Sequence, residues 1–324
     1  DQPASDGNSH MSLAFVFPGQ GSQSVGMLAA LAAAEPVVQQ TFAEASAVLG
    51  YDLWALCQQG PEAELASTER TQPAMLAAGV ATWRAWLRHG GPKPVAMAGH
   101  SLGEYTALVC SGALEFAAAV DLVRFRGQVM QEAVPLGLGA MAAVLGLDDA
   151  QIVEACREAE QGEVVEAVNF NSPGQVVIAG NATAVARAID AAKARGAKRA
   201  VTLPVSVPSH SRLMIGAAAR LAERLAGVDV RMPDVPAVYT VDVQTHASPH
   251  GIRRALKEQL YKPVRWSETV RAMLASGVTT LVECGPGKVL TSLNRRIERR
   301  PELAMLAVED PEGLAAALAV CREK

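Results

Sequence analysis

The sequence feature that most constrains the fold is a Gly-x-Ser-x-Gly segment between a predicted strand and a predicted helix. An apolar run over residues 94–98 leads into Gly99, Ser101 and Gly103, and a helix-like stretch follows. At such a junction the pattern is typical of a nucleophile elbow, in which a sharp turn exposes the serine and the glycines supply backbone freedom. Free N–H groups of the first helical turn, such as Leu102, would stabilise an oxyanion beside the serine. The segment predicts nucleophilic acyl chemistry; the alternative is a small-residue turn with an ordinary serine.

Length and composition fit a protein with a large aliphatic core. The 324 residues are 50% hydrophobic but only 4% aromatic, which allows about two domains built on Ala, Val and Leu. No apolar run approaches the roughly 18 residues of a membrane span. Residues 1–10 resemble a disordered tag remnant, and without a secretory signal we expect a cytoplasmic protein. The five cysteines are scattered without C-x-x-C spacing, so we expect neither a disulfide framework nor a metal site.

Charge is distributed unevenly along the chain. Residues 251–300 carry eleven Lys or Arg and four Glu, a local charge of +7, which leaves −11 for the remainder of a chain with net charge −4. A basic segment of this kind fits a solvated helix face, or an anionic partner such as a phosphate-bearing cofactor or an acidic protein. We expect a monomer that binds neither nucleic acid nor a membrane.

Alternating strands and helices on both sides of an insertion predict an α/β fold with a mainly parallel, helix-covered sheet. Residues 27–88 are predicted to be mostly helical, with breaks at 35–36 and 60–61, and residues 235–243 to be extended. The insertion is predicted to contain strands at 140–145, 163–168, 175–179 and 198–203, with helices at 149–161 and 182–195. This βαββαβ order is the ferredoxin-like pattern. We expect a catalytic domain formed by residues 11–136 and 205–324, and a small domain over 137–204.

A glycine-rich loop follows the first predicted strand, residues 13–17. Gly19 and Gly21 begin a G-x-G-x-x-G pattern, but residue 24 is Ser and no Lys-Ser or Lys-Thr follows, which excludes both dinucleotide and P-loop signatures. The loop is instead a turn with free N–H groups. If it lies beside Ser101, the backbone amide of Gln20 supplies a second oxyanion donor.

Two further side chains are candidates for chemistry. Arg126 lies within an apolar helical stripe, where an unpaired charge is costly; it forms either a structural ion pair or a fork that binds a substrate carboxylate. His210 lies on a proline-restricted loop and is the best general base, because His100 should point away from the serine. A lone loop histidine is more often a surface residue, so this role depends on pairing with Ser101.

The chain resembles the bacterial malonyl-CoA:acyl carrier protein transacylases of fatty acid synthesis. The resemblance runs from about residue 13 to the C-terminus and rests on ordered motifs: FPGQGSQ at 17–23, GHSLGE at 99–104, RGQVMQ at 126–131, NFNSPG at 169–174, VPSH at 207–210, QLY at 259–261 and GPGKVL at 285–290.

The resemblance implies a role for each motif residue. Ser101 would be the acylated nucleophile and His210 its base, with the backbone N–H groups of Gln20 and Leu102 as the oxyanion hole. Arg126 would bind the malonyl carboxylate, and the main-chain carbonyl of Gln259 would orient the histidine. It also implies an α/β-hydrolase-like large domain interrupted by the ferredoxin-like small domain, with the site in the cleft between them.

The implied reaction is ping-pong transfer of malonyl from malonyl-CoA to the phosphopantetheine thiol of acyl carrier protein, with no permanently bound cofactor. A subunit that serves a dedicated carrier, as in malonate decarboxylase, belongs to the same class.

Two other hypotheses compete with the transacylase interpretation. An α/β hydrolase would need an Asp or Glu between the serine and the histidine in chain order, and a neutral substrate would not need Arg126. A non-catalytic acyl-CoA-binding or scaffold protein would not need the serine, histidine and arginine together.

Overall fold

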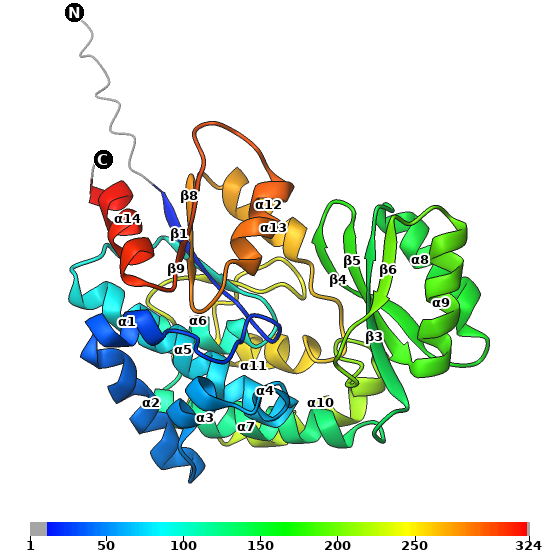
Figure 1. The fold of residues 1–324 in the computed structure, drawn as a ribbon, viewed down its shortest axis with the longest axis horizontal. Helices are drawn as coiled ribbons and strands as arrows, with labels where there is room; N and C mark the ends of the chain where they lie inside the picture. Colours follow the sequence, from blue (N-terminus) through cyan, green and yellow to red (C-terminus); the bar gives the residue numbers. More distant parts are fainter. Residues whose placement is uncertain (1–11, 323–324) are drawn as a thin grey trace, which may run out of the picture.

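The computed structural model describes residues 12–322 and contains two β-sheets that lie side by side (Figure 1). The larger sheet is parallel, with the order β7-β2-β1-β8-β9. Its strands are β1 (Leu13–Phe17), β2 (Ala96–Gly99), β7 (Ala237–Val238), β8 (Thr280–Cys284) and β9 (Ala304–Val308). All five residues of β1 are buried, as expected for a central strand that is covered on both faces.

Helices cover both faces of this sheet. Because successive strand side chains point to opposite faces, Phe15 packs edge-on against Trp83 and Trp86 on one face, whereas Ala14 packs with Trp266 on the other. The helices of the large part are α1 (Ala29–Ala34), α2 (Pro36–Leu49), α3 (Leu53–Gln59), α4 (Glu62–Leu65), α5 (Thr68–Arg88), α6 (Gly103–Cys110), α7 (Phe116–Glu132), η1 (Arg212–Met214), α10 (Ile215–Ala226), α11 (Pro249–Glu258), α12 (Trp266–Ala275), α13 (Val289–Ile297) and α14 (Pro311–Arg322). Among residues 12–322, no helix is both long and apolar enough to span a bilayer.

The smaller sheet is antiparallel and carries its helices on its outer side (Figure 1). Its elements are β3 (Gly139–Leu145), α8 (Asp149–Glu160), β4 (Val165–Ser172), β5 (Gln175–Asn181), α9 (Ala182–Ala194) and β6 (Arg199–Thr202). The strand order β4-β5-β3-β6 is that of a ferredoxin-like sheet. The predicted fold class is therefore confirmed. The domain boundaries at residues 137 and 204 stay a prediction, and the predicted tag remnant at residues 1–10 lies outside the described residues.

One local prediction was wrong, and another, the mostly helical segment over residues 27–88, was correct but incomplete. Residues 235–243 were expected to be extended, but only Ala237–Val238 forms a strand. The chain then turns, and the N–H of Val243 donates to the carbonyl of Tyr239. Residues 27–88 contain a further break, because Gly50 ends α2 with φ of 80° and the Asp52 side chain caps α3. A glycine after one helix and an aspartate before the next are the usual signals for such a break.

The small sheet is joined to the large part of the chain by hydrogen bonds from β4 to the loop between α11 and α12 and to the Gly-x-Ser-x-Gly turn. The N–H of Phe170 in β4 donates to the carbonyl of Val264, and the N–H of Val264 donates to the carbonyl of Val168. The His100 ring, next to Ser101, is hydrogen-bonded through Nε2 to Oδ1 of Asn171 at 2.8 Å. These bonds fix the small sheet directly beside the predicted nucleophile.

The close approach of α7 to α5 yields a stability prediction. A Cβ at buried Gly127 of α7 would lie 2.8 Å from the Cα of Glu69 and 2.9 Å from the carbonyl oxygen of Thr68, so the helices must separate. We expect Gly127→Ala to lower the free energy of unfolding by about 1–3 kcal/mol. Gly216→Ala in α10 is the matched control, because nothing lies within 4 Å of its added Cβ. We expect the free energy of unfolding of this control variant to rise by about 0.5–1 kcal/mol, because alanine favours a helix more than glycine does. Urea unfolding measures both; equal effects would contradict the packing argument.

Candidate active site

Ser101 lies at the carboxyl end of β2 in a strained backbone conformation. Its φ is 55°, a left-handed value that non-glycine residues rarely adopt. The tight turn requires both flanking glycines. A Cβ at Gly99 would lie 1.9 Å from the carbonyl carbon of Gly103, and a Cβ at Gly103 would lie 2.0 Å from the carbonyl oxygen of Phe17. The segment therefore has the predicted elbow geometry, with a half-buried serine between β2 and α6.

His210 comes from the chain that returns from the small sheet, and it contacts Ser101 directly. Its Nε2 lies 2.9 Å from the serine Oγ, and its Nδ1 lies 2.6 Å from the main-chain carbonyl oxygen of Gln259. Because a carbonyl only accepts hydrogen bonds, Nδ1 carries the proton and Nε2 is free to accept from the serine. The structure thus pairs the two residues as the sequence analysis required. It places a carbonyl, rather than an Asp or Glu, behind the histidine.

The surroundings of His210 hold its ring in the neutral form. Its side chain is buried. Burial and the nearby guanidinium of Arg126 both lower the pKa of His210, to about 3. A neutral imidazole is the form that accepts a proton.

Arg126 projects from α7 into the same site and is 1% exposed. Its Nη1 donates to Oε1 of Gln72 at 2.9 Å, and its Nη2 donates to Oε1 of Gln259 at 2.6 Å and to Oγ of Ser101 at 3.2 Å. Its Nε has no partner among residues 12–322. No carboxylate within the described part of the chain pairs with this guanidinium, so the alternative of a structural ion pair is not what the structure contains.

The backbone amides of Gln20 and Leu102 are available as donors. The loop after β1 lies against the elbow, since a Cβ at Gly19 would lie 2.4 Å from the carbonyl oxygen of His100 and 3.6 Å from the amide nitrogen of Leu102. Neither the amide of Gln20 nor that of Leu102 has an acceptor among residues 12–322. Leu102 follows Ser101 directly and Gln20 belongs to the loop that lies against the elbow, so both amides are free to donate, and their role as an oxyanion hole stays a prediction.

Two residues of the site were missed by the sequence analysis. Gln72 of α5 binds Arg126, and Glu104 of α6 accepts a hydrogen bond from the Gln259 side chain at 2.5 Å. Gln72 offered the same signal as Arg126, a polar side chain next to a long apolar helical run. Glu104 offered none, because an acidic residue in the first turn of a helix is ordinarily explained by the helix dipole.

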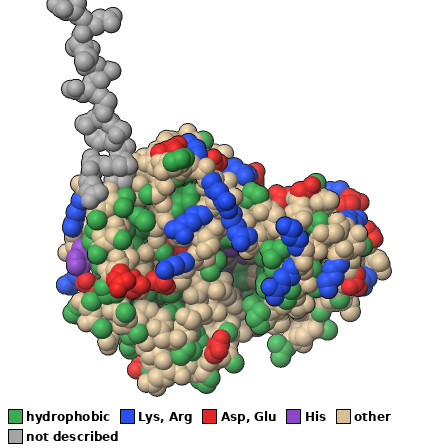
Figure 2. Space-filling view, turned by 45° about the horizontal axis from the view of Figure 1, so that its top comes forward, with side chains coloured by type: hydrophobic (Ala, Val, Ile, Leu, Met, Phe, Trp, Pro, Cys, Tyr) green, Lys and Arg blue, Asp and Glu red, His purple; other side chains and the backbone are tan. Residues whose placement is uncertain are grey.

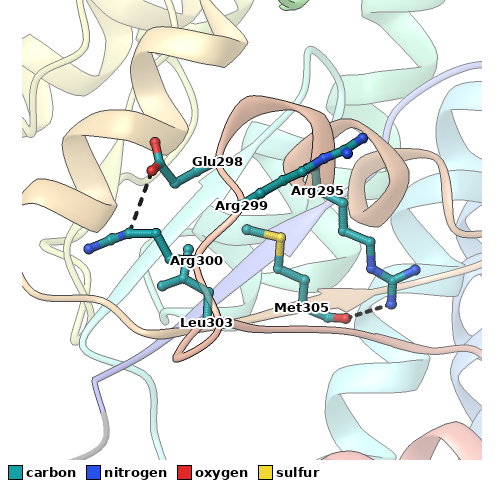
Figure 3. Close-up of a pocket in the computed structure, with 6 residues that line it drawn as sticks. All are labelled: Arg295, Glu298, Arg299, Arg300, Leu303 and Met305. Atoms are coloured by element: carbon teal, nitrogen blue, oxygen red, sulfur yellow. Dashed lines mark hydrogen bonds and ion pairs between the residues drawn. The ribbon is translucent and has the colours of Figure 1, made fainter.

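The cavity shown in Figure 3 lies away from these residues. It measures about 430 Å³ and is lined by Arg295, Arg299, Met305 and their neighbours. These residues surround the amino end of β9, whereas Ser101 follows the carboxyl end of β2 in the same parallel sheet. Arg295 donates to the carbonyl of Met305, and Arg300 pairs with Glu298. The cavity therefore does not belong to the site around Ser101.

The face that contains the hollow between the two sheets is rich in cations. Figure 2 shows Lys and Arg side chains on both sides of this hollow. Such a surface favours the approach of anionic molecules. Among residues 12–322, no cluster of three His, Cys, Asp or Glu side chains is arranged to hold a metal ion.

Comparison with known proteins agrees with this geometry. Residues 14–305 match the acyl transferase domain family. The malonyl CoA-acyl carrier protein transacylase of Escherichia coli (strain K12) is 60% identical over 305 residues, covering 94% of this chain and 98% of that protein. The transacylase structure from Coxiella burnetii superposes with a TM-score of 0.94 at 50% identity, covering 96% and 98% of the two chains.

A third relative was solved with a partner. It is a malonyl-transacylase in complex with a type II polyketide synthase acyl carrier protein, with a TM-score of 0.93, 58% identity and coverage of 95% and 99%. The chain therefore belongs to the acyl transferase domain family and, within it, to the malonyl CoA-acyl carrier protein transacylases.

Proposed function

We propose that this protein transfers the malonyl group of malonyl-CoA to the phosphopantetheine thiol of acyl carrier protein through a malonyl ester on Ser101, and so supplies malonyl carriers for fatty acid synthesis. The observation that carries the proposal is the 3.2 Å distance between Nη2 of Arg126 and Oγ of Ser101. The close relatives are named for the same activity.

The distance matters because of the shape of malonate. A single methylene separates the malonyl carboxylate from the thioester carbonyl, so a cation that binds the carboxylate must lie directly beside the nucleophile. A longer dicarboxylic acyl group would place its carboxylate beyond this guanidinium, and an acetyl group would leave the guanidinium without an anion. Arg126 therefore selects both charge and chain length.

The first half-reaction acylates the serine. Nε2 of His210 takes the hydroxyl proton as Oγ of Ser101 attacks the thioester carbonyl. The N–H groups of Gln20 and Leu102 stabilise the tetrahedral oxyanion, each contributing about 3 kcal/mol by analogy with measured oxyanion donors. The C–S bond then breaks, and the histidine returns its proton to the coenzyme A thiolate.

The second half-reaction runs the same steps in reverse with a new thiol. His210 accepts the proton of the phosphopantetheine thiol, and the sulfur attacks the malonyl ester. Collapse of the second tetrahedral intermediate breaks the C–O bond, and the proton goes to Oγ of Ser101. No permanently bound cofactor takes part in either half-reaction. The monomeric state and cytoplasmic location expected from the sequence stay predictions.

The function is tested by intact mass after mixing the protein with malonyl-CoA or acetyl-CoA. We expect a malonyl adduct on the wild-type protein, no adduct on Ser101→Ala, and a weak adduct with acetyl-CoA. Arg126→Ala should lower malonylation by about two orders of magnitude or more, because the buried charge-assisted contact is lost. Holo acyl carrier protein should then remove the adduct from the wild-type protein.

The outcomes separate the alternatives. Rapid release of free malonate without transfer to the carrier would favour a hydrolase. No adduct and no malonate release would indicate a binding protein.

The lowered pKa of His210 predicts an unusual pH profile. A free histidine near pKa 6.5 would be mostly protonated at pH 5 and unable to act as a base. Since the pKa of His210 is lowered to about 3, the neutral form persists, and we expect kcat/KM for acylation to stay level between pH 7 and pH 5. Stopped-flow acylation measures this profile. A fall with a midpoint near pH 6.5 would show that His210 is not held neutral.

The basic segment over residues 251–300 is our proposed docking surface for the acidic carrier or the coenzyme A phosphates. Lys288 follows the carboxyl end of β8, at the same edge of the sheet as Ser101, and Lys257 lies two residues before Gln259. We expect Lys257→Glu and Lys288→Glu to raise the KM for the carrier several-fold, with less effect at high salt. Lys93→Glu, before the amino end of β2, is the control. A rise in the KM for malonyl-CoA alone would assign the segment to coenzyme A, and an unchanged carrier KM would count against carrier docking.

A further inference from the structure

Glu104 is a buried acid that the reaction above does not use. It lies one helical turn after Ser101 and is 2% exposed. Its Oε1 accepts from Nε2 of Gln259 at 2.5 Å, and its Oε2 accepts from the backbone N–H of Thr240 at 3.1 Å. Thr240 lies two residues after β7, the strand beside β2. No cation among residues 12–322 pairs directly with this carboxyl group, so its role must be sought through Gln259.

The Gln259 side chain links Glu104 to Arg126. Its amide oxygen accepts from Nη2 of Arg126 at 2.6 Å, and its amide nitrogen donates to Glu104 and, at 3.2 Å, to the carbonyl oxygen of Ser101. A flipped amide would point its NH₂ group at the guanidinium, where two donors would oppose each other. The amide orientation that suits Arg126 is therefore the one that an acceptor at Glu104 enforces.

We propose that Glu104 is a positioning residue that acts through the side chain of Gln259 to orient Arg126. The proposal rests on the proposed function, since it assigns Arg126 the malonyl carboxylate. Direct pairing of Glu104 with Arg126 would occupy the guanidinium edge that the substrate needs. With the Gln259 amide between the two residues, Arg126 still donates to an acceptor, the amide oxygen, and no competing anion lies beside Ser101.

The groups around Glu104 come from several elements. Arg126 of α7 and Asp242 after β7 act on the pKa of Glu104, and the carboxyl group of Glu104 in turn raises the pKa of Tyr105 in α6 and of Tyr239 after β7. Burial raises the pKa of Glu104 to about 8, although its two N–H donors and Arg126 oppose the rise. Glu104 is therefore neutral below and ionised above about pH 8, whereas His210 stays neutral throughout this range.

The test compares malonyl-CoA with acetyl-CoA on Glu104→Gln. A glutamine at this position has one oxygen for two N–H donors, so either Gln259 or Thr240 loses its acceptor. We expect kcat/KM for malonyl-CoA to fall about 10–100-fold, as for a misplaced binding group, and the malonyl-to-acetyl ratio to fall with it. Wild-type malonylation measured alongside tests the proposed function separately from this inference.

Glu283→Gln is the matched control. Glu283 of β8 is also buried, but it accepts from the N–H groups of Leu290 and Thr291 and from the Thr291 hydroxyl, and it has no hydrogen bond to a site residue described above. We expect this variant to lose stability while keeping the malonyl-to-acetyl ratio. If Glu104→Gln lowers both substrates equally, as a stability effect would, the inference is overturned.

A charge swap tests the same idea where Glu104→Gln folds poorly. The double variant Glu104→Gln with Gln259→Glu keeps an acceptor for Thr240 and for Arg126, but it moves the carboxylate directly onto the guanidinium. We expect this variant to be folded, as shown by a cooperative unfolding transition, and to lose malonyl transfer almost completely. Transfer at the wild-type rate would show that the position of the charge is irrelevant and would overturn the inference.

The pH dependence of selectivity gives an independent readout. We expect the wild-type malonyl-to-acetyl ratio to rise between pH 7 and pH 9 as Glu104 ionises and accepts both N–H groups more strongly, and the ratio of Glu104→Gln to stay level. The same rise in both proteins would assign the titration to another group and contradict the role of Glu104.

Discussion

A buried guanidinium without a directly paired carboxylate is the constraint on which the rest of the site depends. Arg126 is 1% exposed and is held by amide oxygens and a hydroxyl. Desolvating a charge is costly unless hydrogen bonds and neighbouring charges compensate. Neutral acceptors satisfy its donors only in part, and Nε keeps no partner among residues 12–322. The site can therefore bind an anion. Because Ser101 lies beside the guanidinium, the carbon that the serine attacks must lie close to the anionic group of the same molecule.

The fold keeps the guanidinium in place through packing far from the chemistry. Gly127 lets α7 approach the backbone of α5, and this approach brings Arg126 to Gln72. On the other side, hydrogen bonds between β4 and Val264 join the small sheet to the loop before α12. The nucleophile, its base and the cation come from different elements, so their distances depend on both contacts. A parallel sheet favours this assembly because the carboxyl ends of neighbouring strands meet at one edge.

The sequence predicted most of the elements and the residues that the structure brings together around Ser101, but not the side chains that connect them. Ser101 stood in a motif, and Arg126 was anomalous within an apolar stripe, so each could be found from local pattern. The strand β7 was overestimated because the apolar residues Tyr239 and Val241 lie in a turn beyond Val238, where they pack into the core without forming a ladder. Glu104 could not be assigned, since its partners lie 155 and 136 residues away in the chain. Only the tertiary fold shows that it is buried against an amide.

The absence of an acid beside His210 in the described structure follows from the same constraint. A serine hydrolase orients its histidine with a carboxylate. Here a carboxylate at Nδ1 would lie close to Arg126, whose field already lowers the pKa of His210, and it would compete for the guanidinium with the malonyl carboxylate that we propose as its ligand. The main-chain carbonyl of Gln259 fixes the same tautomer at 2.6 Å without adding a charge. Gln259 therefore serves both needs at once: its backbone carbonyl accepts a hydrogen bond from His210, and its side chain accepts one from the guanidinium to which we assign the malonyl carboxylate.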